Sequence, residues 1–341
     1  MHMADALLSV PVGLAMWAVS GTSVGLSAAR LQKDAFSDKK LPLMAVSGAF
    51  VFAAQMINFT IPGTGSSGHI GGGILLAAML GGAPALLTIT AVLVIQCLLF
   101  ADGGLLALGC NLFNMGVIPC LVVYPLVFRP LLRRGVQRGR LTAASVLGAV
   151  LSLQLGAFSV VLETTASGIA ALPFAAFLWL MQPIHLAIGL AEGFVTAGVL
   201  VFVWRMRPEL LESTQQRQRL PAGVSLRRIV LVLAAAALVT AGGLSLLASA
   251  HPDGLEWSIQ RITGSAEPAA GDEAHRTAAP MPDYETSAGS GPSAAGLIGT
   301  AATFALAGAA GLTITAVRRR AAHNKTTKDT AAHDGHTQQD Q

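Results

Sequence analysis

Charged side chains are scarce in this sequence. Of its 341 residues only 12% are Asp, Glu, Lys or Arg, while 53% are hydrophobic and the mean hydropathy is +0.61. In a soluble domain roughly a quarter of the residues are charged. The shortage excludes an ordinary soluble globular protein and favours a chain that crosses a lipid bilayer several times.

Cysteine and N-terminal basic residues are also in short supply. The three cysteines, Cys97, Cys110 and Cys120, all lie in apolar runs. An odd number in such settings argues against a disulfide framework, so we expect these side chains to be buried as small hydrophobic groups. No basic stretch precedes the first apolar run, which argues against a cleavable signal peptide.

One glycine-rich stretch lacks the lysine that would normally follow its glycine spacing. The sequence GTGSSGHIGGG, residues 63–73, begins like a phosphate-binding loop. Such a loop continues with Lys and then Ser or Thr, whereas this chain has His69 and Ile70. Because the ammonium group and the magnesium-binding hydroxyl are both missing, a nucleotide site is excluded here.

Long apolar runs, by contrast, are abundant. A spanning helix needs about 20 residues, and the longest run is interrupted by Gly81-Gly82-Ala83-Pro84, which predicts two short helices. A later run contains Pro183 and predicts one crossing preceded by an interfacial or re-entrant piece. We therefore predict an all-α polytopic membrane protein with nine crossings, seven in a core and two after it, within about 4–28, 41–61, 72–100, 104–128, 142–166, 171–204, 229–250 and 293–317.

The basic residues indicate how these crossings are oriented. With nine crossings, 20 of the 22 Lys and Arg fall on one side, and only Arg261 and Arg276 fall on the other. By the positive-inside rule the basic side is the cytoplasm. The sequence thus predicts an N-terminus outside, a cytoplasmic C-terminus, and His69 and Asp102 at the outer face.

Two histidines on the predicted outer face suggest a metal site. The amine of Met1 and the amide nitrogen of His2 would close a five-membered chelate ring, and that amide with Nδ1 of His2 a six-membered ring. His69 is available to supply a fourth nitrogen. Four nitrogens in a plane suit Ni²⁺ or Cu²⁺ and accommodate Co²⁺, whereas zinc prefers a tetrahedron and calcium prefers oxygen. The alternative is an incidental His2 and a solvated His69 in a tight connection.

Four stretches resemble a known transporter family: MHMADALLS, LPLMAVSGAFVFAAQMINFTIPGTGSSGHIGGG, LFADGGLLALGCNLFNMG and PIHLAIGLAEG. They are similar to the substrate-capture subunit, CbiM or NikM, of the energy-coupling factor cobalt and nickel importers. The resemblance covers about residues 1–205. It implies that the amine of Met1, the amide and imidazole of His2, and His69 hold the metal. It also implies a transported ion, Ni²⁺ or Co²⁺, rather than a permanently bound cofactor.

The same resemblance implies partners in the bacterial cytoplasmic membrane. The sequence contains no ATP-binding motif, so a transmembrane coupling subunit and two ATPase subunits would be separate chains. In this transporter class a similar alanine pattern docks the capture subunit on the coupling protein, and here Ala45, Ala49 and Ala53 recur every four residues. Packing within the chain is the alternative explanation of these alanines.

The second half of the sequence has a signature of its own. Pro252-Asp253-Gly254-Leu255-Glu256 resembles the PDGLE segment of the small accessory subunit NikN, which has two membrane helices and an external loop. Planar nitrogen ligation and this segment favour nickel, while close relatives of the motif set serve cobalt uptake. We expect a tight turn here that presents Leu255 and Trp257 above the metal ligands. The chain then divides into a metal-binding part, a basic linker, an accessory domain and a disordered cytoplasmic tail, at 1–205, 206–228, 229–317 and 318–341.

Polar residues near the loop and in the spans have two readings each. Four polar residues lie in or near the loop: Gln55, Asn58, Ser66 and Ser67. They are expected either to form hydrogen bonds that fix the histidine tautomers or only to satisfy the loop backbone. Asp5 and Asp102 are outer-face carboxylates, and we expect them either to attract cations or to cap helices. In the spans we expect a structural polar pair rather than a second metal site from His185 and Glu192, and interhelical hydrogen bonds from Asn111 and Asn114.

Two other classes of function compete with a metal importer subunit. A self-sufficient cation channel would repeat polar residues along several spans, whereas this chain concentrates them at the outer mouth. A membrane metalloenzyme would need an open metal position and a general base, and the sequence has no His-Glu-x-x-His. Residues 259–292, rich in Ala, Gly, Pro, Ser and acids, are expected to be poorly ordered.

Overall fold

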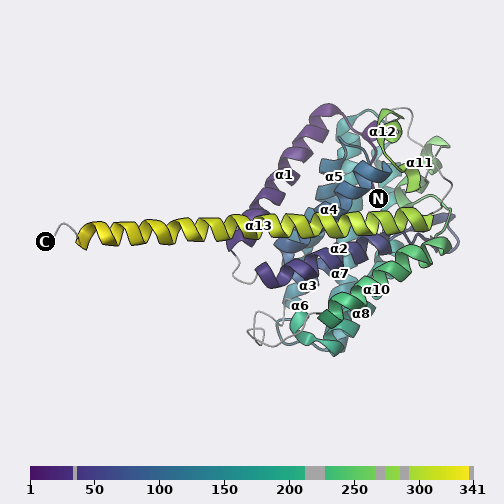
Figure 1. Cartoon of the computed structure of the whole chain (residues 1–341). Helices are drawn as coiled ribbons and strands as arrows, with labels where there is room; N and C mark the ends of the chain where they lie inside the picture. The colour runs from purple at the N-terminus through teal and green to yellow at the C-terminus, as the bar shows by residue number, and fades with distance from the viewer. Residues whose placement is uncertain (34–36, 212–226, 266–272, 285–291, 338–341) are drawn as a thin grey trace.

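Figure 1 shows the computed structural model of the chain, which describes residues 1–33, 37–211, 227–265, 273–284 and 292–337. Apart from one short hairpin, the regular structure of these residues is helical. The long elements of the first part are α1 (Val10–Lys33), α2 (Ser37–Gln55), α4 (Gly82–Phe100), the π-helical η2 (Phe113–Phe128), α7 (Arg138–Ser167) and α8 (Phe174–Met206). Its short elements are η1 (Asp5–Leu7), β1 (Phe59–Ile61), β2 (Ser66–Gly68), α3 (Gly73–Leu80), α5 (Leu108–Leu112), α6 (Arg129–Leu131) and η3 (Pro208–Leu210).

The second part contains two long helices and four short ones. The long helices are α10 (Arg227–Gly242) and α13 (Pro292–Thr337). The short ones are η4 (Leu244–Leu247), α11 (Gly254–Thr263), α12 (Glu273–Ala278) and η5 (Pro282–Tyr284). Part of the segment predicted to be poorly ordered is therefore helical, because α11, α12 and η5 pack against the first part of the chain.

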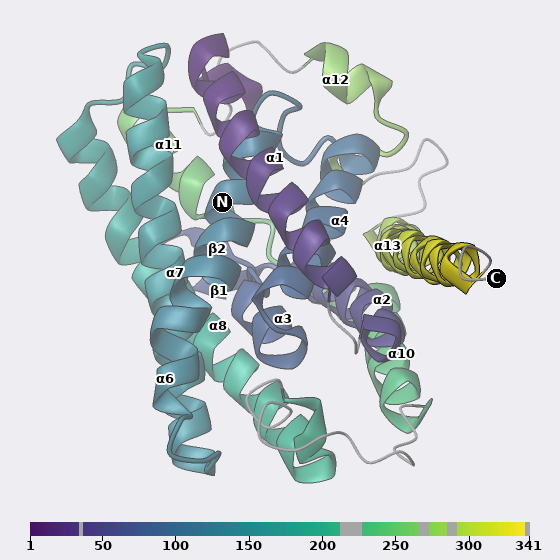
Figure 2. The same cartoon turned by 90° about the vertical axis from the view of Figure 1, so that its left-hand side faces the viewer.

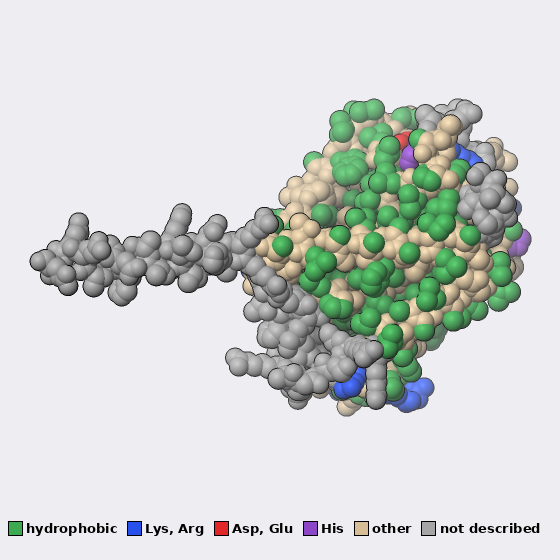
Figure 3. Space-filling view, in the orientation of Figure 1, with side chains coloured by type: hydrophobic (Ala, Val, Ile, Leu, Met, Phe, Trp, Pro, Cys, Tyr) green, Lys and Arg blue, Asp and Glu red, His purple; other side chains and the backbone are tan. Residues whose placement is uncertain are grey.

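Six helices in the described residues are long and apolar enough to cross a membrane: Val10–Lys33, Gly82–Phe100, Leu108–Leu131, Arg138–Ser167, Phe174–Met206 and Ser293–Val317. Two shorter apolar helices are Leu41–Gln55 and Val230–Gly242. Hydrophobic side chains are spread over the face that Figure 3 shows, and the few coloured as charged lie near its edges. The chain is a multi-pass membrane protein, as the sequence predicts, while the number of crossings and their orientation stay predictions.

The apolar run 72–100 breaks where the sequence predicts, but its first helix is short. The helix α3 ends at Leu80 and α4 begins at Gly82. At 1.5 Å per residue α3 extends about 12 Å, under half of a ~30 Å hydrocarbon core. Residues 69–72 are not helical, and Gly72 has a φ of 76°, in the left-handed region that favours glycine. This crossing is therefore a half-helix preceded by irregular backbone.

The apolar run 171–204 is simpler than we predicted. The helix α8 continues without interruption through Pro183, so the re-entrant piece expected before it is absent. The side-chain nitrogen of Gln154 on α7 donates to the carbonyl of Gln182 over 2.8 Å, so the two helices are hydrogen-bonded beside the proline.

The first residues of the chain turn inward instead of starting the first crossing. The helix α1 begins at Val10, six residues later than the apolar run suggests. Met1, Met3, Leu7 and Leu8 are buried. Figure 2 shows the N-terminus lying among the helices and close to α11. The segment that precedes α1 therefore belongs to the interior of the protein.

The helices of the second part cover one side of α2. Ala45, Ala49 and Ala53 are all buried, with at most 4% of their surface exposed. Ala53 clusters with Ala237 and Ala241 of α10, and α13 packs along α2 as well. Close approach of these helices fits the alternative explanation, packing within the chain, while docking of a coupling subunit on these alanines stays a prediction.

The ends of the second part differ from the prediction in one respect. The helix α13 continues beyond residue 317 to Thr337 and projects away from the other helices (Figure 1), where a disordered tail was expected from 318. Residues 338–341 lie outside the described part of the chain. Most of the predicted linker, 212–226, lies outside it too.

Candidate metal-binding site

The glycine-rich stretch forms a small hairpin and then a deep loop. The strands β1 and β2 are antiparallel, with Thr60 opposite Ser67. The turn between them needs glycine, because Gly63 and Gly65 have φ values of 76° and 74°. After β2 the chain passes through His69 to α3, so the hairpin sets where the imidazole enters the protein.

The non-helical backbone that follows His69 is held by two buried side chains of the core. The carboxylate of Glu192 on α8 accepts hydrogen bonds from the backbone nitrogens of Gly71 and Gly72, both over 2.9 Å. The side chain of Gln55 donates to the carbonyl of Gly71 over 2.9 Å. Irregular backbone at membrane depth needs such partners. Glu192 is thus a structural residue, but its partner is the loop backbone and not His185.

The imidazole of His69 presents one free nitrogen. Its Nδ1 donates to the carbonyl of Ile70 over 3.1 Å, which leaves the lone pair on Nε2. Burial and the neighbouring Met1 ammonium lower the pKa of His69 to about 4. The ring is therefore neutral near pH 7 and has the tautomer that a metal ligand needs.

The first residues are anchored so that Met1 and His2 lie beside His69. The backbone of Met3 exchanges two hydrogen bonds with the side chain of Asn111, over 2.8 and 3.2 Å. The carboxylate of Asp5 accepts from the backbone nitrogen of Ala107 over 2.7 Å. Asp5 is therefore a backbone cap, and Asn111 binds the N-terminal segment rather than only another helix.

The ring of His2 stacks on the ring of His69, with centroids 5.4 Å apart and an interplanar angle of 19°. Its Nε2 lies 3.2 Å from the side-chain oxygen of Gln96, and its Nδ1 lies 3.1 Å from Asp102. Burial lowers the pKa of His2, and the nearby Asp102 opposes that shift. Coordination through Nδ1 would replace the contact with Asp102, while Gln96 can keep its bond to the opposite nitrogen.

Gln96 extends a chain of amides that links the two histidines. Its side-chain nitrogen donates to the side-chain oxygen of Gln55 over 2.9 Å, and Gln55 in turn holds Gly71. Of the residues predicted to surround the ligands, Gln55 belongs to this network. The sequence analysis missed Gln96, although an amide in an otherwise apolar span is a recognisable signal.

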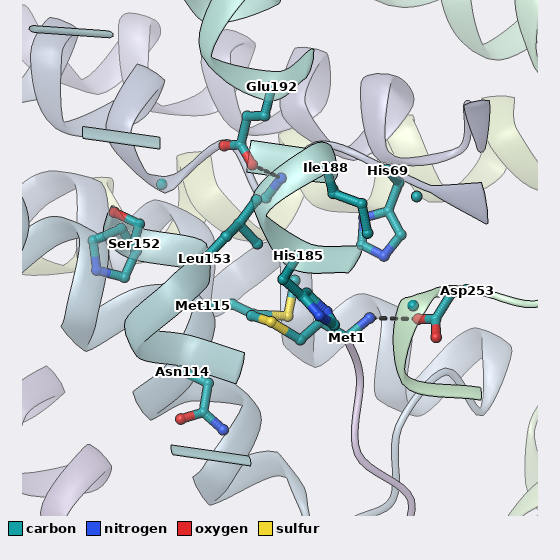
Figure 4. A pocket seen from close by; sticks show the side chains of 15 residues that line it. Met1, His69, Asn114, Met115, Ser152, Leu153, His185, Ile188, Glu192 and Asp253 are labelled. Carbon is teal, nitrogen blue, oxygen red and sulfur yellow. Dashed lines mark hydrogen bonds and ion pairs between the residues drawn. The ribbon is translucent and has the colours of Figure 1, made fainter. Parts of the chain in front are cut away.

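The amine of Met1 forms an ion pair with Asp253 of the PDGLE segment. Although burial acts in the opposite direction, the Met1 ammonium holds the pKa of the Asp253 carboxyl well below its usual range. Figure 4 shows the two groups facing each other at the edge of a pocket that His69 also lines. A residue of the second part thus contacts one of the predicted metal donors directly.

The segment around Asp253 is a helix start rather than the tight turn we predicted. The side chain of Asp253 accepts hydrogen bonds from the backbone nitrogens of Leu255 and Glu256, and Glu256 returns a bond to the backbone nitrogen of Asp253. This reciprocal capping begins α11. Leu255 is buried, and Trp257 donates from its ring nitrogen to the carbonyl of Thr64 over 3.0 Å.

The two predicted serines of the loop bind the PDGLE segment and not a histidine. The backbone nitrogen of Ser67 donates to the carbonyl of Pro252 over 2.8 Å, and its hydroxyl to the carbonyl of His251 over 2.7 Å. The hydroxyl of Ser66 lies 3.4 Å from the same Pro252 carbonyl. These bonds fasten the accessory segment to the strand that precedes His69.

Gly254 permits a close approach to the core. A Cβ at this position would lie 3.0 Å from Cε1 of His185 and 3.1 Å from Cδ1 of Ile188. Nδ1 of His185 donates to the carbonyl of Met181 over 2.8 Å. The same pocket is lined by His185, Met1 and His69 (Figure 4). A residue larger than glycine would therefore press on His185 and Ile188 and force these side chains or the PDGLE segment to shift.

Two of the singled-out asparagines, Asn58 and Asn114, form no hydrogen bond with Met1, His2 or His69 in the described part of the chain. The side-chain oxygen of Asn58 is buried without a hydrogen-bond partner, and only its backbone carbonyl takes part, accepting from Ser249. Asn114 donates to Glu163 of α7 over 2.8 Å, an interhelical bond as predicted. Cys97, Cys110 and Cys120 are buried and unbridged, also as predicted.

A bundle of apolar helices around a buried polar centre is the architecture of a multi-pass membrane transport protein. The chain belongs to the CbiM family, the cobalt uptake substrate-specific transmembrane region, which matches residues 2–210. Residues 227–316 match the PDGLE domain. The two matches fall on either side of the predicted linker, and the protein is a transporter component rather than an enzyme.

The chain is similar to proteins named as fused nickel transport proteins and as cobalt transport proteins. The chain is 33% identical over 285 residues to the fused nickel transport protein NikMN of Rhodobacter capsulatus, covering 79% of each chain. It is also 33% identical to a putative fused nickel transport protein NikMN of Archaeoglobus fulgidus, covering 62% of this chain and 68% of the relative. A putative cobalt transport protein CbiM of Methanococcus voltae is 30% identical, over 62% of this chain and 95% of that relative.

A solved structure supports the fold. A crystal structure described as a transition metal transporter superposes with a TM-score of 0.55 at 29% identity. The match covers 64% of this chain and all of the other.

Proposed function

We propose that this chain is the substrate-binding membrane subunit of an ATP-driven energy-coupling factor importer for a divalent transition metal. The ion is Ni²⁺ or Co²⁺, with nickel favoured by the planar nitrogen donors and by the PDGLE domain. It binds in a square of four nitrogens: the amine of Met1, the amide of His2, Nδ1 of His2 and Nε2 of His69. The ion is cargo, and no cofactor is permanently bound.

The observation that carries this proposal is the meeting of Met1, His2 and His69 from opposite ends of the first 70 residues. His69 offers a neutral ring with a free Nε2, and His2 stacks beside it. Among the described residues no group of three or more His, Cys, Asp and Glu side chains is arranged to hold a metal ion. A site built partly from the amine and a backbone amide is consistent with that finding.

The other subunits of the importer are separate chains. A transmembrane coupling subunit and two ATPase subunits supply the energy, and the whole complex lies in the bacterial cytoplasmic membrane. The metal site faces outward, with the N-terminus outside and the C-terminus in the cytoplasm. This orientation rests on the concentration of Lys and Arg in the loops opposite the site.

The accessory domain controls access to the site in this proposal. Asp253 pairs with the amine that must ligate the ion, and the PDGLE segment is fastened to the strand before His69. A segment so held admits the ion when it moves away, or delays closure of the chelate until an ion has arrived. Its role is therefore kinetic, because it supplies none of the four nitrogens.

The first experiment moves the amine. One residue added before Met1 takes the amine out of the five-membered ring, so tight Ni²⁺ binding by the purified protein should be lost while membrane insertion is retained. The matched control carries the same residue after Gln341. Unchanged metal content in the N-terminally extended protein would remove the chelate from the proposal.

The second experiment removes the accessory domain. A chain truncated after about residue 225 should still bind Ni²⁺ at equilibrium, yet show little uptake of radiolabelled ion in cells that contain the coupling and ATPase subunits. Full uptake by the truncated chain would refute the access role. Loss of equilibrium binding would mean that the domain helps to build the site itself.

A further inference from the structure

The accessory domain reaches the site at a second place, through the short segment 275–284. The backbone nitrogen of Met281 donates to the carbonyl of Leu99 over 3.0 Å. The ring of Tyr284 stacks on Phe100, with centroids 4.5 Å apart and an interplanar angle of 16°. Both contacts lie at the end of α4, next to the loop that carries Asp102. The segment is therefore docked on the outer end of α4.

The backbone of this segment is held in an uncommon conformation. Asp283 and Tyr284 have φ values of 54° and 60°, in the left-handed region that residues other than glycine rarely adopt. An ion pair between Arg276 and Asp283 closes the segment on itself. Two consecutive strained residues persist only where the surroundings fix them, and such strain gathers at functional positions.

The strained conformation directs the hydroxyl of Tyr284 onto the carboxylate beside His2. This hydroxyl donates to Oδ2 of Asp102 over 2.5 Å. The other oxygen, Oδ1, lies 3.1 Å from Nδ1 of His2. Burial and the adjacent Asp102 raise the pKa of Tyr284, so the hydroxyl stays protonated and can only donate to the carboxylate.

We propose that Tyr284 is a positioning residue of the metal site. By fixing one oxygen of Asp102 it holds the other oxygen on Nδ1 of His2, the nitrogen that must turn to the ion, and so keeps the imidazole out of the ligand set until an ion arrives. An ion must displace this contact when it binds, so the contact lowers the affinity of the site. The inference rests on the proposed function, because it assigns Tyr284 to the same ligand set.

The accessory domain then occupies both donors of the first two residues. Asp253 contacts the amine of Met1, and Tyr284 holds Asp102 on the imidazole of His2. The two contacts come from separate helical segments, α11 and η5, and residues 266–272 between them lie outside the described part of the chain. Loss of one contact therefore need not remove the other.

A double-mutant cycle on the full-length purified protein tests this inference, with Ni²⁺ affinity measured against a competing chelator. Tyr284→Phe keeps the stacked ring and removes only the hydroxyl, and we expect affinity to rise by up to about tenfold, because the contact that binding must break is weaker. Asp102→Asn, which removes the carboxylate, should raise affinity at least as much. Because Tyr284 acts through Asp102, the double variant should bind no more tightly than Asp102→Asn alone.

The matched control is Trp257→Phe, which removes another hydrogen bond between the same domain and the first part of the chain. It does not involve Asp102, so its effect should simply add to that of Asp102→Asn. Wild-type affinity in Tyr284→Phe, or additive effects of Tyr284→Phe and Asp102→Asn, would overturn the positioning role.

His69→Ala separates failure of the inference from failure of the proposed function. If His69→Ala loses Ni²⁺ binding while Tyr284→Phe binds like wild type, only the role of Tyr284 is wrong. If His69→Ala binds Ni²⁺ like wild type, the nitrogen site itself is wrong and Tyr284 loses its assignment with it.

Discussion

Two segments face each other across Met1, and they are stabilised in opposite ways. The loop 68–73 makes few hydrogen bonds of its own and depends on Glu192 and Gln55 from the core. The PDGLE segment 252–256 satisfies its own helix start through reciprocal bonds between Asp253 and Glu256. The first segment cannot change shape without leaving buried donors unpaired, whereas the second keeps its structure if it moves as a unit.

This difference suggests separate roles for the two segments, one in binding the ion and one in access to the site. A binding loop benefits from a fixed shape, because an ion is held tightly only when its donors are already in place. An access element must be able to leave and return, and a self-capped helix start does so at little cost to its internal hydrogen bonds.

Removing the ligand on the fixed loop should have the largest effect. His69→Ala should weaken Ni²⁺ binding by more than the roughly 10–100-fold typical of residues that only orient ligands. The matched control is His185→Ala, which alters the same pocket but removes none of the proposed donors, and which should mainly lower thermal stability. Ni²⁺ titrations and melting curves of both variants measure these effects. If His185→Ala lost Ni²⁺ binding and His69→Ala did not, the metal site would lie elsewhere.

Removing the Glu192 carboxylate, which binds the loop backbone, should have the next largest effect. Glu192→Leu leaves the backbone nitrogens of Gly71 and Gly72 buried without an acceptor, at about 1–3 kcal/mol each in folding free energy. Ni²⁺ affinity should fall with stability, because the loop that carries His69 loses its shape. Glu192→Gln keeps one acceptor oxygen and should lie between Glu192→Leu and wild type. A stable Glu192→Leu protein would show that the loop supports itself.

Changing the access segment should affect rate more than equilibrium. Asp253→Asn keeps a good helix cap but loses the ion pair with Met1, so Ni²⁺ affinity should change less than about tenfold while uptake in cells slows. Glu256→Gln is the matched control, since it weakens the cap without touching the amine. A large loss of equilibrium binding in Asp253→Asn would make that residue part of the site and not only of its access.

The smallest expected effect is the dependence of Ni²⁺ affinity on pH. Because burial lowers the pKa of both imidazoles, and that of His69 to about 4, neither ring should need to lose a proton near pH 7. Binding should release about two protons per ion, from the Met1 ammonium and the His2 amide. Affinity should therefore rise with pH around neutrality, and the His69 contribution should be lost only as pH falls towards 4. Calorimetry in buffers of different ionisation enthalpy measures the proton count, and a count near zero would favour oxygen ligands.

The proposed metal donors could be predicted from the sequence because much of their chemistry is local. A histidine at position two forms chelate rings with the amine and its own amide, and a histidine in a glycine-rich loop is a further donor. The break at Gly81 was also predicted from local residues, since glycine and proline close together favour a helix boundary. Alanines at a spacing of four predicted close helix packing, with packing inside the chain as one of two alternatives, and α10 and α13 of the same chain pack against α2.

Other parts of the site depend on tertiary contacts that no local pattern encodes. Tyr284 lies in a stretch of small and acidic residues whose composition predicts disorder, and its contacts with Phe100 and Asp102 fix it. The serines of the loop looked like partners for a histidine, yet the hydroxyl of Ser67 donates to a carbonyl 184 positions away, and that of Ser66 also reaches one 186 positions away. Gln96 stands out as an amide in an apolar span, but its role depends on its contacts with Gln55 and His2.

The contact between Met1 and Asp253 joins residues 252 positions apart. At a synthesis rate of 5–20 residues per second, the N-terminal residue leaves the ribosome roughly 13–50 s before its partner. During that interval the amine is exposed to every enzyme that trims or acylates new chains, without the carboxylate that later covers it. The order of biosynthesis, as well as the geometry of the finished fold, therefore decides how many molecules acquire a complete set of donors.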